Sequence, residues 1–228
     1  MPSYARKHQL SNALVYHVFN RSNAKVSIFN KEEDFVYFVK LLKEYAQRFE
    51  LTIYHWVIMS NHYHLLMEIE TPEDISAFMA GLNRAYTHYY HKTYETSGFL
   101  WQGRFKSQPV QKEKYMLACG RYIERNPVMA GLVLEAVDYS YSSARFYCLG
   151  KADSITVQDP LYPEFGSDVR QRQINYTKFL HNFDTEEEKT FANLENPLGD
   201  KEFLRRLICE SGRYIPRRRG RLTERIVA

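Results

Sequence analysis

The order in which strand-like and helix-like segments alternate constrains the fold of this chain more than any other feature. Short strand-like segments lie at 13–19, 51–58 and 62–70, and 107–111 is a candidate for a short fourth strand. Longer segments with apolar residues at helical spacing lie at 31–49, 72–90 and 112–126. The order β-α-β-β-α-β followed by a helix predicts an α+β fold. We expect a ferredoxin-like antiparallel sheet with two helices on one face, an added third helix and a C-terminal extension.

The periodicity weakens after residue 150, which divides the 228 residues into two predicted parts. Residues 1–150 form the predicted main domain. Residues 151–228 form an extension in which 151–199 is irregular, 200–211 is a short helix and the rest is a basic tail. The arginines of this end are Arg205, Arg206, Arg213, Arg217, Arg218, Arg219, Arg221 and Arg225. A dense arginine cluster is typical of a segment that binds a polyanion, although a solvated tail without a specific partner has the same composition.

Composition excludes several classes of protein. Apolar residues make up 44% of the chain and charged residues 25%, which excludes collagen-like and wholly disordered chains. No apolar run reaches the roughly 18 residues that a membrane-spanning helix needs, so we expect no membrane partner. Cys119, Cys148 and Cys209 are far apart and odd in number, which is typical of a reducing cytoplasm rather than a disulfide framework or a Cys-x-x-Cys metal site.

The third predicted strand carries a histidine pair. Because side chains alternate along a strand, His62 and His64 lie on one face while Tyr63 points to the other. Two such imidazoles, about 7 Å apart, can converge on one divalent ion at about 2.0–2.2 Å from each ring nitrogen. Two ordinary half-exposed histidines would give the same pattern, and two nitrogens do not complete a coordination shell.

The third predicted helix offers a partner for that pair. Tyr122 and Asn126 are four residues apart and therefore lie on one helix face, and Pro127 is expected to end the helix at Asn126. The amide oxygen of Asn126 is a candidate third ligand, which would leave Tyr122 beside the ion. On spacing alone, packing on the sheet is the more common role for such a tyrosine, and Asn126 could simply terminate the helix.

Five stretches, in the same order, resemble the single-tyrosine HUH transposases, most closely the REP-associated tyrosine transposases with their IS200-like domain. They are YHVFNR (16–21), MSNHYHLLMEI (59–69), FLWQGRFKS (99–107), RYIERNPVMAGLV (121–133) and YSSARFYCLG (141–150). The resemblance implies that residues 1–150 are the catalytic domain and that His62 and His64 are the metal ligands. It also implies that Tyr122 is the nucleophile and that Asn126, where some relatives have Gln, helps to hold the ion.

The implied activity is metal-dependent nicking and strand transfer on single-stranded DNA that carries a hairpin. Attack by Tyr122 would leave a 5′-phosphotyrosine and a free 3′-hydroxyl, so rejoining needs no ATP. An ordinary phenol, with a pKa of about 10, is only about 0.1% ionised at pH 7, and a divalent cation on the scissile phosphate offsets that deficit. Mg²⁺ is the expected ion, and Mn²⁺ should tolerate the imidazole ligands better.

The resemblance also implies the partners. They are single-stranded or hairpin DNA, such as a repetitive extragenic palindrome, with no small-molecule substrate, and the expected location is the cytoplasm at the nucleoid. A homodimer is left open, because relatives differ in whether the tyrosine serves its own subunit or a neighbour.

Basic and aromatic residues supply candidate DNA contacts. The candidates for phosphate are Arg21, Arg104, Lys106, Arg121 and Arg125, together with Arg217, Arg218 and Arg219 of the tail. Phe99 and Trp101 are candidates for stacking on unpaired bases. Each charge could instead be a solvated surface group, and the two aromatic side chains could instead hold their loop onto the core.

Two other functions stay open at this point. One is a regulatory protein of the same fold that binds nucleic acid without cutting it. The other is a metallonuclease that uses activated water, whose cleavage would survive the loss of Tyr122. The complete set of His62, His64 and Tyr122 argues against the first, because binding alone has no chemical need for all three.

Overall fold

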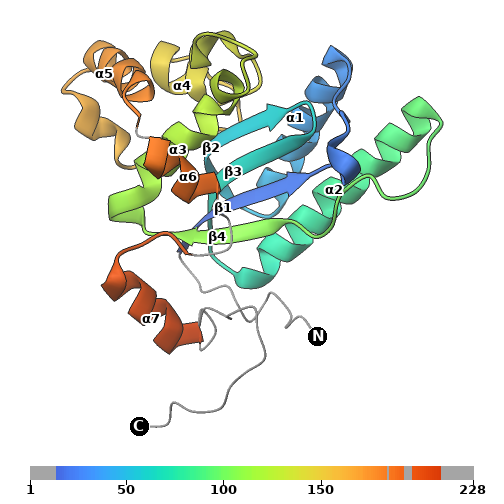
Figure 1. The fold of residues 1–228 in the computed structure, drawn as a ribbon, viewed down its shortest axis with the longest axis horizontal. Coiled ribbons are helices and arrows are strands. Elements are labelled where there is room, and N and C mark those ends of the chain that lie inside the picture. The colour runs from blue at the N-terminus through green and yellow to red at the C-terminus, as the bar shows by residue number, and fades with distance from the viewer. Residues whose placement is uncertain (1–13, 184, 193–196, 212–228) are drawn as a thin grey trace.

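The computed structural model describes residues 14–183, 185–192 and 197–211 (Figure 1). A sheet at its centre consists of β1 (Leu14–Arg21), β2 (Thr52–Met59), β3 (His62–Ile69) and β4 (Lys106–Val110). The strand order is β2-β3-β1-β4, and each neighbouring pair is antiparallel. The predicted ferredoxin-like α+β sheet is therefore confirmed, with the third strand beside the first.

Two helices cover one face of the sheet, α1 (Glu32–Arg48) and α2 (Pro72–Tyr94) (Figure 1). The carboxylate of Asp34 accepts hydrogen bonds from the backbone N–H groups of Asn30 (2.8 Å) and Lys31 (3.0 Å), which fixes the start of α1. Both helices pack their apolar stripes on inward-facing strand residues. The buried members of this core include Tyr16, Val18, Ile53, Leu65, Met67, Phe38, Leu42, Phe78 and Leu82.

The third helix, α3 (Lys112–Met129), covers the opposite face over a second core that includes Val15, Leu66, Val110, Met116 and Ile123. Its predicted end at Asn126 is wrong, because the helix continues through Pro127. Pro127 has no N–H to donate to the carbonyl of Ile123. The side-chain amide of Asn126 donates instead to the carbonyls of Ile123 (3.3 Å) and Tyr122 (2.8 Å). This compensation lets the helix pass the proline.

The chain beyond residue 130 is more regular than predicted. It forms α4 (Ala144–Leu149), α5 (Val169–His181), α6 (Thr185–Ala192) and α7 (Lys201–Ser211), with short 3₁₀ turns at Ala136–Asp138 and Tyr162–Phe165. The expectation of an irregular 151–199 is therefore wrong, whereas the short helix expected from residue 200 is confirmed. A third core of tyrosines and aliphatic residues holds α4 and α5 together, and it includes Tyr147, Tyr162, Tyr176 and Leu180.

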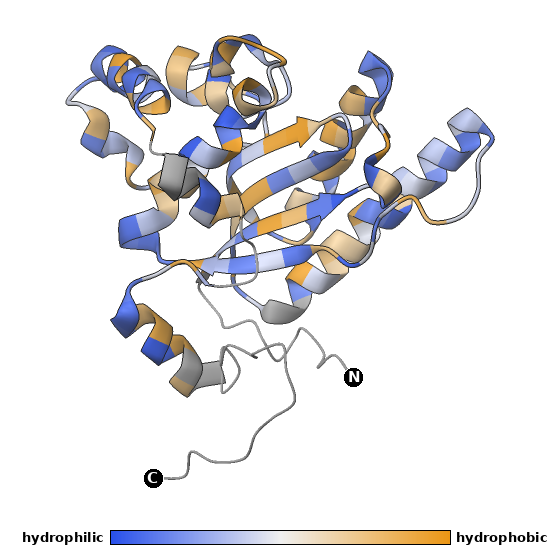
Figure 2. Cartoon of the chain, in the orientation of Figure 1, coloured by the Kyte–Doolittle hydropathy of each residue, from blue (hydrophilic) through white to orange (hydrophobic). Residues whose placement is uncertain are grey.

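Segments of the extension also reach both edges of the sheet. Thr156 forms a parallel bridge with Ile53 of β2, and Leu198 forms one with Val110 of β4. β2 and β3 contain hydrophobic stretches, whereas the C-terminal part of α2 is mostly hydrophilic (Figure 2). No helix in the described part of the chain is long and apolar enough to cross a membrane. The proposed division at residue 150 stays a prediction.

Candidate metal and tyrosine site

Strand register places the histidine pair among residues from three strands. His62 of β3 lies opposite Arg21 of β1, and His64 lies opposite Phe19. Phe19 pairs in turn with Lys106 of β4. Because directly paired residues point to the same face of a sheet, all of these side chains lie on the face that α3 covers.

The Nδ1 atom of each histidine in the pair is engaged by a neighbouring polar side chain. His62 Nδ1 lies 2.6 Å from the Oδ1 atom of Asn61, and His64 Nδ1 lies 2.7 Å from the Nε2 atom of His17. The two rings are 5.2 Å apart between centroids. Metal-binding histidines commonly use one nitrogen for the ion and the other for an orienting hydrogen bond. The Nε2 atoms of His62 and His64 are therefore the nitrogens that can bind an ion.

Burial keeps these imidazoles neutral at pH 7. It lowers the pKa of His17 to about 3 and holds the pKa of His64 well below its ordinary value. Burial also lowers the pKa of His62 to about 4, against the effect of a hydrogen bond with Asn126, while the charge of Arg21 lowers it further. A neutral imidazole is the form that binds a metal ion, so these rings are in the protonation state that a metal ligand requires.

The tyrosine helix brings Tyr122 to the same place. The Tyr122 ring lies 5.8 Å from the ring of His64 and 5.9 Å from that of His17, measured between centroids. The ring of Phe191, from α6, also lies 5.8 Å from the Tyr122 ring between centroids. Tyr122 is only 6% exposed as a result. The phenol thus contacts imidazoles on the sheet and is covered by α6.

Asn126 completes the group of predicted residues. Its Nδ2 atom donates to the helix carbonyls of Tyr122 and Ile123, which directs the amide oxygen away from the helix backbone. A hydrogen bond between the Asn126 side chain and His62 raises the pKa of that imidazole, against the larger lowering by burial. The structure therefore brings His62, His64, Tyr122 and Asn126 together.

This donor set fits a divalent cation. Among the described residues, no three His, Cys, Asp or Glu side chains converge as a metal site, so a third protein donor would be of another type. The amide oxygen of Asn126 is such a donor. Two imidazole nitrogens and one amide oxygen would leave coordination positions of such an ion for substrate oxygens, as in catalytic metal sites.

Comparison with known proteins assigns the chain to a family. A family model described as "Transposase IS200 like" matches residues 11–126. This chain belongs to the IS200-like transposase family. A solved structure of a REP-associated tyrosine transposase bound to a REP hairpin has a TM-score of 0.55 with this chain at 18% identity, covering 70% of this chain and 93% of the other. That likeness shows the fold, and no curated protein sequence matches.

Of the basic residues considered for DNA contact in this IS200-like transposase, three lie near the site or in the loop before β4. Arg21 is beside His62, and it also donates to the side-chain oxygen of Gln102 at 3.2 and 3.0 Å. Lys106 is exposed at the start of β4, and Arg104 is exposed just before it. Arg217, Arg218 and Arg219 lie outside the described residues.

The other two candidate arginines bind the C-terminal end of α5. Arg125 is buried, donates to the carbonyl of Leu180 at 2.8 Å and lies 3.4 Å from the ring centre of Phe183. Arg121 donates to the carbonyl of Asn182 and lies over the ring of Phe179. Cations are favourable at a helix C-terminus, where carbonyls are left without intrahelical partners. These contacts give both arginines a structural role.

The two aromatic candidates differ from each other. Phe99 is 90% exposed, which suits stacking on a base. Trp101 instead packs edge-on against Tyr63, and its indole N–H donates to Thr87 and to the carbonyl of Asn83 on α2. Trp101 therefore holds the loop onto the core.

Sequence reasoning missed Asn61 and His17. Asn61 lies inside the MSNHYHLLMEI stretch, directly before His62, so its position was a signal. His17 lies in the YHVFNR stretch, and strand alternation places it on the same face as Phe19 and Arg21. Its contact with His64 depends on the β1–β3 register, which pattern alone does not supply.

Proposed function

We propose that this IS200-like transposase nicks and rejoins single-stranded DNA beside a hairpin, with Tyr122 as the nucleophile. The observation that carries the proposal is the position of Tyr122, whose ring centroid lies 5.8 Å from that of His64. Asn126, one helical turn further on, approaches His62. A nucleophile beside a set of neutral metal-binding donors is the arrangement that phosphoryl transfer to a phenol needs.

His62, His64 and Asn126 would hold the ion, which is Mg²⁺ in the cell, with Mn²⁺ also supporting activity. When bound, such a cation polarises the scissile phosphate and stabilises the charge that develops during attack. Asn61 and His17 orient the two imidazoles through their Nδ1 atoms. The neutral histidines are ligands rather than proton acceptors in this scheme.

The covalent step conserves the energy of the phosphodiester. Attack by the Tyr122 hydroxyl oxygen on the scissile phosphorus forms the phosphotyrosine bond and breaks the bond from phosphorus to the 3′-oxygen. The phenol loses its proton and the departing 3′-oxygen gains one, so the products are a 5′-phosphotyrosine and a 3′-hydroxyl. Attack by a 3′-hydroxyl on that phosphotyrosine reverses the step and joins strands.

The partner we propose is hairpin-bearing single-stranded DNA, met in the cytoplasm at the nucleoid. The solved relative of the same fold is described as bound to a REP hairpin, which supports this choice. Arg21 beside His62 and exposed Lys106 on the same sheet face would neutralise phosphates, and exposed Phe99 would stack on a base.

An oligonucleotide cleavage assay tests the proposal. A hairpin-bearing oligonucleotide labelled at its 3′ end, with Mn²⁺, should form a covalent adduct, because the tyrosine retains the strand downstream of the nick. Tyr122→Phe should abolish the adduct, whereas Tyr115→Phe, which alters a partly buried tyrosine of the same helix, should leave it. Replacing His62 and His64 with Ala should remove metal-dependent cleavage from a folded protein. An adduct that persists in Tyr122→Phe refutes the assignment.

A non-cutting DNA-binding function is the second candidate, and the burial of Tyr122 under Phe191 favours it. It predicts a gel shift with the hairpin but no nicked product under any divalent metal. Cleavage that gives a nick without an adduct and survives Tyr122→Phe would instead indicate a water-using metallonuclease.

A further inference from the structure

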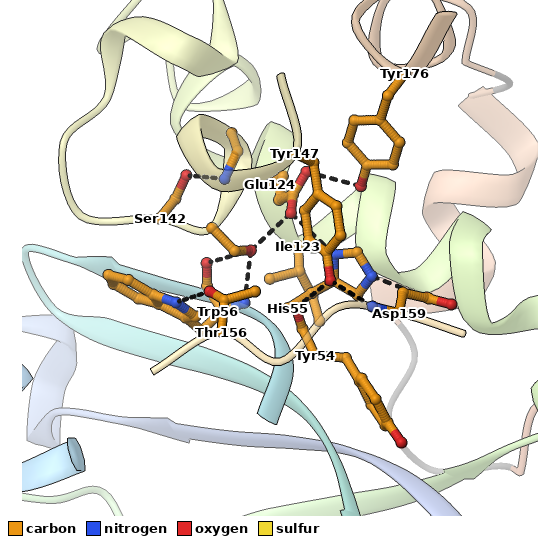
Figure 3. A network of polar contacts seen from close by, with 12 residues as sticks. Tyr54, His55, Trp56, Ile123, Glu124, Ser142, Tyr147, Thr156, Asp159 and Tyr176 are labelled. Carbon is orange, nitrogen blue, oxygen red and sulfur yellow. Dashed lines mark hydrogen bonds and ion pairs between the residues drawn. The ribbon is translucent and has the colours of Figure 1, made fainter. Parts of the chain in front are cut away.

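A second buried polar cluster, centred on His55, lies on the face of the sheet that α3 covers and is separate from the proposed metal site. His55 of β2 is fully buried between two carboxylates (Figure 3). Its Nδ1 atom lies 2.9 Å from the Oε1 atom of Glu124 on α3, and its Nε2 atom lies 3.1 Å from the Oδ2 atom of Asp159. The cluster therefore joins the sheet, the tyrosine helix and the C-terminal extension.

Both carboxylates have further hydrogen-bond donors. Glu124 accepts from the hydroxyl of Ser143 at 2.6 Å. It also accepts from the hydroxyl of Tyr176 at 2.9 Å (Figure 3). Asp159 accepts from the backbone N–H of Leu161 at 2.7 Å. Buried polar networks of this kind specify one arrangement when their members are satisfied.

The imidazole of His55 is charged at neutral pH. Burial by itself lowers its pKa, but the hydrogen bonds to Asp159 and Glu124, together with their charges, outweigh burial and raise the pKa to about 9. Its ring also stacks on Tyr147 at 4.6 Å between centroids. A buried imidazolium between two carboxylates strongly resists the separation of its partners, because each would be left as an unpaired buried charge.

The His55 ring lies very close to α3, so its contact with Glu124 is sensitive to the rotation of that helix. Gly120 and Glu124 lie one turn apart and face His55 together. A Cβ atom at Gly120 would lie 2.7 Å from the His55 ring, so only glycine permits this approach. Arg121 and Arg125 form the next stripe around the helix and bind α5, and Tyr122 and Asn126 form the stripe after that.

We propose that Glu124, through its buried contact with His55, whose other ring nitrogen binds Asp159, is the positioning residue that sets the rotation of the tyrosine helix on its own sheet. This inference rests on the proposed function. Successive helix residues are about 100° apart, so the stripe held by His55 determines where the Tyr122 stripe points. A rotation of about 20° moves an atom about 6 Å from the helix axis by about 2 Å. Misplacement of a reacting group by about 1 Å can cost about a hundredfold in rate.

The alternative is that the cluster only stabilises the fold. Asp34 provides a matched control for it, because it is a buried carboxylate on the opposite face of the sheet. It accepts hydrogen bonds from Asn30, Lys31, Tyr89 and Tyr94. Asp34→Ala therefore removes a comparable carboxylate network without touching α3.

The experiment measures DNA affinity and the single-turnover rate of adduct formation at saturating DNA, per folded molecule. Glu124→Ala should slow the adduct by about a hundredfold with unchanged DNA affinity. Glu124→Gln, which keeps the length and an acceptor oxygen, should recover most of the rate. Asp34→Ala should lose stability but keep the wild-type rate.

Several results would overturn the proposal. They are a wild-type rate in folded Glu124→Ala, a defect in DNA affinity instead of rate, and a Gln variant as slow as the Ala variant. If Glu124→Ala does not fold, Tyr176→Phe removes one hydrogen bond to the same carboxylate and should still slow the adduct; an unchanged rate there also overturns it. A wild-type protein that forms no adduct is a different result, since it refutes the proposed function itself.

Discussion

Two buried histidines flank Leu66 in one row of the sheet, and they differ in charge. His17 of β1 pairs with Leu66 on one side, and His55 of β2 pairs with it on the other. Both are fully buried. Burial lowers the pKa of His17 to about 3. In His55, the carboxylates that face the ring outweigh burial and raise the pKa to about 9.

The comparison separates two uses of the same side chain. His17 contacts the imidazole of His64, so it belongs to a neutral cluster that can orient a metal ligand. His55 contacts Glu124 and Asp159, so it forms an ion-paired junction between β2, α3 and the extension. Partner chemistry, not burial, decides which role a buried histidine takes.

The largest expected effect is on stability at alkaline pH. The folded-state pKa of His55 lies above the ordinary histidine value of about 6.5, so its stabilisation is complete below pH 6.5 and is lost as pH rises through about 9. The loss should amount to about 3 kcal/mol in the free energy of unfolding. Urea unfolding at pH 6, 7.5 and 9 measures it.

His55→Gln serves as the control for this prediction, because it removes the titrating group. Its free energy of unfolding should fall less between pH 6 and 9 than that of the wild type. Equal slopes in the two proteins would show that His55 does not carry the alkaline loss, and the contrast between the two histidines would then fail.

The second prediction concerns the neutral histidine. His17→Leu removes the partner of His64 Nδ1, so that imidazole loses its orientation and Mn²⁺ affinity should fall about tenfold to a hundredfold. His17→Gln supplies an acceptor near the position of the lost nitrogen and should restore most of the affinity. Titration with Mn²⁺ measures both. Wild-type affinity in the Leu variant would show that His17 only fills space.

Local patterns predicted the four strands and three helices of the first part of the chain, because their apolar periodicity is strong. They did not predict α5 and α6. In α5 the buried residues are Tyr176 and Leu180, and a tyrosine carries both an apolar ring and a polar hydroxyl, so the stripe is weak as a hydropathy signal. The extension was therefore expected to be irregular.

The site shows the same limit. His62 with His64 and Tyr122 with Asn126 share faces because each pair lies within one element, and the structure brings the two pairs together. The His55 cluster joins residues 69 and 104 positions apart, so no local spacing could reveal it. Arg125 of α3 was likewise expected to contact DNA. Its actual partner is the carbonyl of Leu180 on α5, a helix that the sequence pattern did not predict.

The smallest predicted effect concerns Phe191, whose buried ring packs near Tyr122. A DNA phosphate has to reach the Tyr122 hydroxyl, so the Phe191 ring must move during the reaction if the proposed function holds. Its burial opposes that movement by about 2 kcal/mol, so Phe191→Ala should speed adduct formation by at least about tenfold. The same change also lowers the free energy of unfolding, because it removes a buried ring from the core.

Phe203→Ala is the control that separates access of DNA to the Tyr122 hydroxyl from a general loss of stability. Phe203 of α7 is also buried, so its loss should cost similar stability, but it should leave the adduct rate unchanged. Equal acceleration in both variants would mean that loosening the fold, not uncovering the phenol, limits the reaction. No acceleration in Phe191→Ala would mean that DNA binding by itself already displaces α6 from Tyr122. In that case the burial of Tyr122 would describe only the DNA-free protein, and the comparison between the neutral and the charged cluster would be unaffected.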